Sequence, residues 1–186
     1  MMLIGKEILK DGHPNLRLRS KAVEMPPSEE DRKTLSDMLE FVINSQDPEF
    51  TEKTGIRAGI GLAAPQINVL KRMIAIHISE EGAEPISMTF FNPRIISHSV
   101  EKTYISSGEG CLSVDENFPG FVPRHARIRV KANDLDGNEF EMTATGLLGI
   151  CLQHEIDHLN GILFYDHINK ENPFGTIENA VVLERI

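Results

Sequence analysis

Residues 146–160 read GLLGICLQHEIDHLN, and they decide the fold that we predict for this chain. A helix built from them is apolar on nearly every side, so it must be buried rather than lie on a surface. Gly161 follows directly and is a typical residue to end a helix, because glycine adopts a left-handed backbone at no steric cost. A helix of this kind belongs in the core, with the other elements packed around it.

Strand-like segments precede this helix. Residues 73–79, 88–100 and 125–135 are rich in β-branched and aromatic side chains, which are typical of strands. Apolar and polar residues alternate on both sides of the turn signal at residues 136–137, and this pattern predicts a hairpin with one buried face. Residues 180–183 are expected to form a final strand.

An amphipathic helix is expected early in the chain. Ser28 and Asp31 have the spacing of a capping box, and apolar residues follow at helical spacing up to about Asn44. The polar segment 44–57 is expected to be a surface loop. The predicted fold class is therefore α+β, with mostly antiparallel β-sheets enclosing a buried central helix. Residues 1–186 are expected to form a single catalytic domain.

Composition and charge exclude several classes of protein. Apolar residues make up 40% and charged residues 25% of the chain, a balance that allows a core without disulfides. The sequence shows no signal peptide and no segment that could span a membrane, and it has only two cysteines, so a cytoplasmic protein is expected. The net charge of −9 argues against sequence-specific nucleic-acid binding over a large surface.

The central helix contains the pattern HExxH. His154 and His158 are four residues apart, so their imidazoles lie on one face and can bind the same metal ion. Glu155 is displaced from that face, yet it can reach a water molecule at the metal and act as a general base. Chance occurrence is the alternative, but polar side chains on a buried helix need partners, and a metal supplies them.

A third protein ligand must come from another part of the chain, and three positions are candidates for it. Phe164 occupies the position at which one zinc-protease pattern has its third ligand, and phenylalanine cannot bind metal. Glu178 lies twenty residues after His158, as in other zinc proteases, but on an uncertain tail. Cys111 lies between strand-like segments with glycines beside it, and it is the favoured ligand. Cys151 is too far along the helix from His158 to share its metal.

Three segments resemble the signature motifs of the peptide deformylase family. They are GIGLAAPQ at residues 59–66, EGCLS at 109–113 and QHEIDH at 153–158, in the order found in the family and without a departure in any of them. The resemblance covers nearly the whole chain, including HPNLR at 13–17. The loop at 44–57 and the short apolar tail resemble the branch of the family found in Gram-positive bacteria.

The resemblance implies a role for several residues. Cys111, His154 and His158 would bind the metal, in agreement with the elimination above, and Glu155 would be the general base and then the general acid. The Gln66 side-chain amide and the backbone N–H of residue 112 would donate hydrogen bonds to the oxyanion. The catalytic residues implied by the family are thus Glu155, Gln66 and Leu112. The residues expected to contact the substrate are Ile60, Gly61, Gly110, Leu147, Ile150 and Cys151.

The implied reaction is removal of the formyl group from the N-terminal formylmethionine of new polypeptides. Water activated by the metal and by Glu155 attacks the formyl carbon, and formate leaves. The family implies one divalent ion per chain, Fe²⁺ natively, with Ni²⁺, Co²⁺ or Zn²⁺ possible in purified protein. Its partners would be formyl-Met N-termini, with transient proximity to the ribosome, and a monomer is expected. No membrane partner is expected.

Other functions were also considered. A zinc endopeptidase would use Glu178 as third ligand, a thiol hydrolase would use Cys111 as nucleophile, and a metal-stabilised binding module would have no need of Glu155. Arg124 and Asp157 are expected to support the site by pairing with residue 109 or with each other. No role was assigned to the remaining histidines, which show no ligand spacing: His13, His77, His98, His125 and His167.

Overall fold

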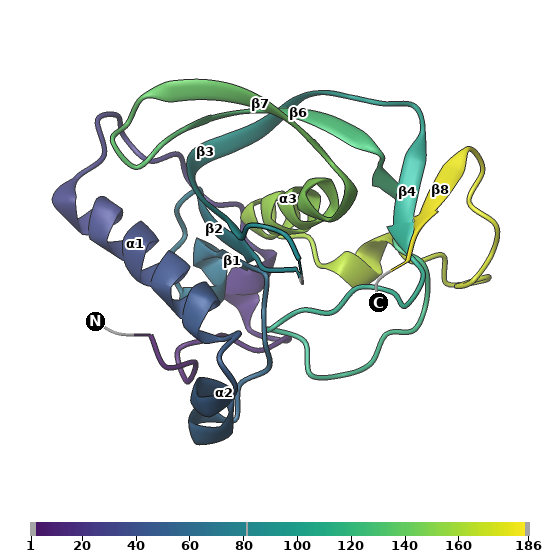
Figure 1. The fold of residues 1–186 in the computed structure, drawn as a ribbon, viewed down its shortest axis with the longest axis horizontal. Coiled ribbons are helices and arrows are strands. Elements are labelled where there is room, and N and C mark those ends of the chain that lie inside the picture. The colour runs from purple at the N-terminus through teal and green to yellow at the C-terminus, as the bar shows by residue number, and fades with distance from the viewer. Residues whose placement is uncertain (1–2, 81, 185–186) are drawn as a thin grey trace.

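The computed structural model describes residues 3–80 and 82–184, so both ends of the expected domain lie outside the described residues. It shows a mixed α/β fold whose sheets are mostly antiparallel, as the sequence predicted (Figure 1). None of the described helices combines the length and the apolar character that a bilayer span requires.

The larger sheet has five strands in the order β1-β2-β3-β6-β7, and each strand is antiparallel to its neighbours. The strands predicted within residues 73–79 and 88–100 and the predicted hairpin, which is β6 and β7, belong to it. Their bounds are β1 Gly61–Ala63, β2 Met73–Ile78, β3 Ile86–His98, β6 Arg127–Asn133 and β7 Glu139–Thr145. Strand β3 contains Pro93 at a shift of its register with β6, and this irregularity lets the sheet accommodate a residue without an N–H donor.

A smaller sheet has three strands in the order β5-β4-β8. Strand β4 (Lys102–Ile105) pairs antiparallel with β5 (Arg124–His125) and parallel with β8 (Ala180–Leu183). The final strand expected at residues 180–183 is therefore confirmed. It brings the C-terminal segment beside the strand that leads toward Cys111.

Helix α1 (Glu29–Asn44) begins at the cap predicted from the sequence. The Ser28 Oγ accepts a hydrogen bond of 3.1 Å from the N–H of Asp31, and one face of the helix packs into the core. The expected loop at 44–57 is wrong in part, because Pro48–Thr54 form a short helix, α2. Asp47 caps its start and Gly55, with φ of 70°, ends it, yet a seven-residue segment with one large apolar side chain, Phe50, is too short to show helical periodicity.

Helix α3 (Gly146–Leu159) carries the quoted segment and lies centrally in Figure 1. It contacts strands of both sheets, and Leu152 and Leu159 are fully buried. Gly161 follows the helix with φ of 75°, and a Cβ atom there would lie 2.5 Å from the carbonyl oxygen of Arg17. Glycine is therefore required both by the backbone conformation and by this close approach. Three short 3₁₀ turns complete the fold: η1 Pro14–Arg17, η2 Ala64–Ile67 and η3 Phe164–His167.

Candidate metal centre and adjoining pocket

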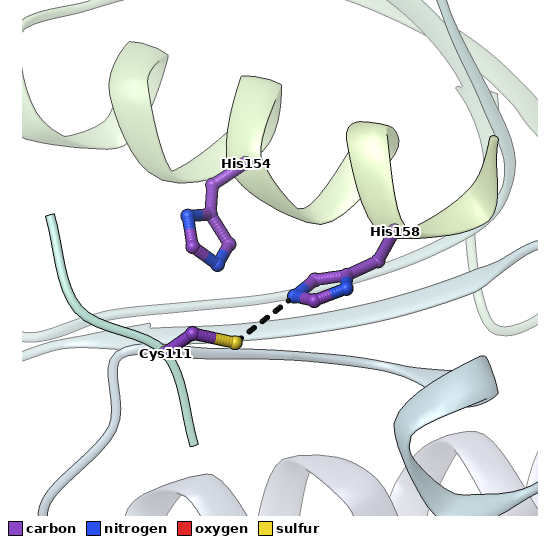
Figure 2. A group of neighbouring side chains, drawn as sticks. All are labelled: Cys111, His154 and His158. Carbon is purple, nitrogen blue, oxygen red and sulfur yellow. Dashed lines mark hydrogen bonds between the residues drawn. The ribbon is translucent and has the colours of Figure 1, made fainter. Parts of the chain in front are cut away.

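Helix α3 brings His154 and His158 to the same side, one turn apart, and both face Cys111 on the segment between β4 and β5 (Figure 2). One ligand atom from each of the three residues lies within 4.8 Å of the other two. The Cys111 Sγ is 3.2 Å from the Nε2 of His158. None of the three residues is more than 9% exposed, so the cluster is shielded from bulk water.

The electrostatics of the cluster favour a thiolate. Burial opposes ionisation of Cys111, but the nearby imidazoles of His158 and His154 outweigh it and hold the pKa of the thiol well below its ordinary value. Burial likewise opposes protonation of His154, yet Cys111 and Glu109 raise the pKa of its imidazole well above the usual range. A thiolate and two imidazoles are the ligands that suit zinc, iron and similar ions, so the donor set fits a divalent transition metal.

A chain of buried polar contacts holds His154 in place. The Glu109 carboxylate accepts a hydrogen bond of 2.8 Å from the Nδ1 of His154, which leaves the Nε2 free to face the cluster. Arg124 donates two hydrogen bonds to Glu109, of 2.8 and 2.9 Å, and a third of 2.5 Å to Asp157. The His167 Nε2 lies 2.8 Å from the same Asp157 oxygen. Burial would raise the pKa of Glu109, but Arg124 and His154 hold it at about 2.

The side chain of Glu155 is less fully hydrogen-bonded than that of its neighbour His154. The residue is 4% exposed, and its Oε2 has no hydrogen-bond partner among the described residues. Burial raises the pKa of this carboxyl group. A Cβ atom on Gly61 would lie 2.4 Å from the Oε1 of Glu155, so only glycine in β1 leaves room for the carboxylate. The cluster thus has a buried carboxylate beside it with an unused oxygen.

Gln66 is 1% exposed, so its side chain lies inside the protein rather than in a surface turn. Its Oε1 accepts a hydrogen bond of 2.9 Å from the N–H of Ala63, which fixes the orientation of the amide. Its Nε2 donates to the Oγ of Ser113 at 3.1 Å and approaches the Cys111 Sγ at 3.6 Å. The N–H of Leu112 makes no hydrogen bond to another described residue.

A pocket of about 180 Å³ opens beside the cluster and Glu155. Strand β1 lies at the edge of the larger sheet, so one side of it pairs with no other described strand, and Gly61 on this strand lines the pocket. All the residues predicted to contact the substrate line it: Ile60, Gly61, Gly110, Leu147, Ile150 and Cys151. The structure therefore brings together residues from three distant segments of the chain.

The alternative positions for the third metal ligand lie away from the cluster or have side chains that cannot bind metal. Glu178 is exposed in the turn before β8, and within the described ranges it belongs to no cluster of metal-binding side chains. The ring of Phe164 is buried and stacks on His154, with centroids 6.0 Å apart. The Cys151 Sγ contacts the carbonyl oxygen of Ile60 at 3.8 Å and is not part of the cluster.

Sequence reasoning missed three residues near the site. Arg57 lines the pocket, and its guanidinium donates to the carbonyl oxygen of Cys111 at 3.0 Å. Ser113 holds the Gln66 amide, and its place within the EGCLS motif was a signal that went unused. His167 contacts Asp157 from η3, and no spacing in the sequence announces that contact because the chain turns after α3.

The geometry defines a class of protein. A thiolate and two imidazoles converge on one point, an unpaired carboxylate lies beside them, and a partly apolar pocket adjoins both. Three protein ligands leave a further position for water or substrate, which distinguishes a catalytic metal site from a structural one. The arrangement is that of a metal-dependent hydrolase.

Comparisons with known proteins identify the family. A family model described as polypeptide deformylase matches residues 5–174. Peptide deformylase 2 of Bacillus subtilis is 55% identical over 184 residues, which cover 99% of this chain and 100% of that protein. The peptide deformylase of Staphylococcus epidermidis is 50% identical over 181 residues, covering 97% and 99%. A crystal structure of a class I type b peptide deformylase from Acinetobacter baumannii with Met-Ala-Ser bound has a TM-score of 0.69 at 30% identity, and covers 87% of this chain and 96% of that one.

The chain therefore belongs to the peptide deformylase family, whose members are metal-dependent hydrolases acting on formyl-methionyl peptides. The resemblance seen in the three motifs is confirmed, as is the similarity to proteins from Gram-positive bacteria. This membership favours a deformylase over the HExxH endopeptidase that would use Glu178.

Proposed function

We propose that this chain removes the formyl group from N-terminal formylmethionine of new polypeptides, with the chemistry taking place at Cys111, His154 and His158. The observation that carries the proposal is the convergence of these three ligand atoms beside the unpaired carboxylate of Glu155. Cys111, His154 and His158 would hold one divalent metal ion. Such an ion supplies Lewis-acid polarisation and makes a water molecule acidic enough to lose a proton near neutral pH.

Glu155 carries the proton in this proposal. Its Oε2 has no partner among the described residues, so it can accept the proton that the attacking water loses. The water oxygen forms a bond with the formyl carbon, and the C–N bond to methionine then breaks. Glu155 returns its proton to the departing amine, so that formate and a free N-terminus are the products. Burial, which raises the pKa of this carboxyl group, makes it a better base for the first transfer.

Gln66 and Leu112 stabilise the negative charge that develops on the formyl oxygen. The Gln66 Nε2 is fixed by Ser113, and its other near contact is only the Cys111 sulfur at 3.6 Å. A hydrogen bond to sulfur is weak, so this N–H can turn to a developing oxyanion. The Leu112 N–H supplies a second neutral donor from the backbone.

The adjoining pocket would accept the substrate. Leu147, Ile150 and Cys151 present apolar surface to the methionine side chain. The peptide that follows methionine would add as a strand along the free edge of β1 near Ile60 and Gly61, through backbone contacts that ignore side-chain identity. The relative from Acinetobacter baumannii has a Met-Ala-Ser peptide bound, and this supports an N-terminal methionine as the recognised group.

Formate release from formyl-Met-Ala-Ser tests the proposal. We expect the metal-loaded chain to release one formate per peptide and to leave the Met-Ala bond intact. The Cys111→Ser variant should lose both tight metal binding and activity, whereas Glu178→Gln should keep both. Retention of metal and of peptide-bond cleavage in Cys111→Ser would contradict the proposal and support the endopeptidase. Activity that survives a chelator but not alkylation would instead support a thiol nucleophile.

We propose Fe²⁺ as the native ion, on the strength of the resemblance to the family. The ligands alone do not select iron, because the usual order of affinity places Zn²⁺ above Fe²⁺, so Ni²⁺, Co²⁺ or Zn²⁺ can occupy purified protein. Metal analysis after anaerobic purification should find iron, with activity that decays in air. Full activity in a sample that contains only zinc would contradict this assignment.

The cellular setting is part of the same proposal. We place the chain in the cytoplasm as a monomer, working on formyl-Met N-termini close to the ribosome, and without sequence-specific contacts to nucleic acid. The fold supports a single catalytic domain over residues 1–186, with α3 enclosed by the two sheets and α1 packed on the outside of the larger sheet. Sedimentation of the purified chain should give the mass of one copy; a dimer at micromolar concentration would contradict the monomer.

A further inference from the structure

A second pocket, of about 500 Å³, lies at the end of α3 that is distant from the methionine pocket. The two pockets have no lining residue in common. Four basic side chains line the second pocket, namely Arg19, Arg72, Arg94 and Lys131, and one acidic side chain, Glu139, joins them. No part of the deformylation proposal uses this pocket.

The excess of positive charge in this pocket runs against the rest of the chain. The sequence has 28 acidic and 19 basic residues, for a net charge of −9. The four basic side chains come from separate segments, which follow η1, precede β2, and lie in β3 and β6. Folding alone gathers them, so no cluster is visible in the sequence. Like charges placed together repel, and this repulsion persists unless an anion is present.

The charges of the pocket are only partly compensated within the chain. Lys131 pairs with Glu139 at 2.5 Å. Within residues 3–80 and 82–184, no carboxylate lies within ion-pair distance of Arg19, Arg72 or Arg94. Three guanidinium groups therefore share one pocket without a matching acid.

Arg72 is held in position by neutral groups. Its Nη1 donates to the Oδ1 of Asn160 at 3.0 Å and its Nη2 donates to the carbonyl oxygen of Pro93 at 3.0 Å. These contacts orient the guanidinium but leave its charge in place. Burial, and then the nearby charge of Arg19, lower the pKa of Arg72, as expected for cations that crowd one another.

Ser20 provides an independent observation. It lines the same pocket and is 5% exposed, and its Oγ has no hydrogen-bond partner among the described residues. A buried hydroxyl without a partner is costly, and native structures rarely leave one unexplained. Its N–H donates to the carbonyl oxygen of Leu159, so the backbone of Ser20 is fixed against the end of α3. An oxyanion in the pocket would accept the hydrogen bond that this hydroxyl lacks.

We propose that this pocket binds a phosphate group, held by Arg19, Arg72 and Arg94 and by the hydroxyl of Ser20. Guanidinium groups match the oxygens of phosphate with paired hydrogen bonds, and a doubly charged anion offsets several cations at once. The phosphate is either free or one group of a nucleic-acid backbone. The basic residues form one pocket rather than a stripe, so only a short part of a backbone would be contacted.

Calorimetric titration of the metal-loaded chain with inorganic phosphate, in a chloride buffer of fixed ionic strength, tests the proposal. The pocket variant Arg19→Ala/Arg94→Ala removes two charges, and the control variant Arg127→Ala/Lys170→Ala removes two exposed charges outside the pocket. We expect saturable binding to the wild type and the control, and at least tenfold weaker binding to the pocket variant. Ser20→Ala should weaken binding as well. All variants should release formate at the wild-type rate.

Equal phosphate affinity in wild type, control and pocket variant would overturn the proposal, since it would place the anion at the metal centre or at no defined site. Absence of saturable binding to the wild type would overturn it too. A ten-nucleotide single-stranded RNA of mixed sequence distinguishes the two sources. Binding at least tenfold tighter than that of free phosphate, and lost in the pocket variant, assigns the phosphate to a nucleic-acid backbone. Binding no tighter than that of free phosphate assigns it to a small ligand.

Discussion

His154 and Glu155 are neighbours on one buried helix, and they differ in how fully their side chains are hydrogen-bonded. The Nδ1 of His154 is paired with Glu109, and Arg124 holds Glu109 together with Asp157. Glu155 is also buried but keeps one oxygen without a partner among the described residues. A metal ligand must stay still, and paired charges fix it, whereas a group that transfers protons must be free to accept one. The contrast agrees with the proposed roles, in which His154 holds the metal and the next residue, Glu155, transfers the proton.

Glu155→Gln breaks the reacting half of this contrast and should have the largest effect. Glutamine keeps the size of the side chain but cannot accept and return a proton, so formate release should fall by a factor of about 10² to 10⁴. The measurement is formate release beside metal content, with the exposed Glu116→Gln as the control. Wild-type turnover in Glu155→Gln would remove the residue from the mechanism.

Arg124→Met breaks the holding half. It leaves Glu109 and Asp157 buried without their cation, a change that typically lowers the free energy of unfolding by about 3–5 kcal/mol. Metal affinity should fall by roughly 10- to 100-fold, because His154 loses its orientation. Denaturant unfolding and metal competition measure the two effects. The exposed Arg129→Met should change neither, and equal stability of the two variants would count against a supporting network.

Gln66→Leu removes a fixed donor without touching the metal ligands. Loss of one oxyanion donor typically lowers kcat by about 10² to 10³. We expect this loss with metal content unchanged, measured as kcat for formyl-Met-Ala-Ser. Ser113→Ala, which removes only the hydroxyl that accepts from the Gln66 Nε2, should cost less, because the Ala63 N–H still orients the amide. A larger loss in Ser113→Ala than in Gln66→Leu would contradict the assigned order of roles.

His167→Ala tests the outermost contact of the network that holds His154, and it should have the smallest effect. The side chain is 34% exposed, and its one hydrogen-bond partner among the described residues is Asp157, which retains Arg124, so metal affinity should fall by at most about tenfold. Replacement by glutamine restores a donor and should recover most of the affinity. The measurement is a metal competition assay, and the stacked but distant His98→Ala is the control. An identical loss in both histidine variants would mean that His167 does not act through Asp157.

Much of the fold was open to prediction because its signals are local. The cap at Ser28, the turn at residues 136–137 and the glycine after α3 each act through neighbouring backbone, and all three occur where expected. Helix α2 was not predicted because it has a single large apolar side chain, Phe50, and one such residue packed on the core cannot show an apolar period. The capping residue and the final glycine of this helix are visible in the sequence, but the polar character of the segment favours a loop in the prediction.

The candidate site divides in the same way. His154 and His158 follow from helical geometry, whereas Cys111 needed elimination and the resemblance of the motifs, because it meets the helix only through the tertiary fold. Contacts such as that between Arg57 and Cys111 depend on how distant segments pack together, so residue spacing along the chain does not predict them. The basic pocket is the extreme case, since its basic residues come from four separate segments.

Formate release divided by bound metal, compared between Glu155→Gln and Arg124→Lys, tests the separation of holding from reacting most directly. At saturating metal, Arg124→Lys should turn over nearly as fast per bound ion as the wild type, although it needs more metal to fill. Glu155→Gln should bind metal as tightly as the wild type and fall at least about 100-fold in turnover per bound ion. Equal losses per bound ion in the two variants would contradict the account.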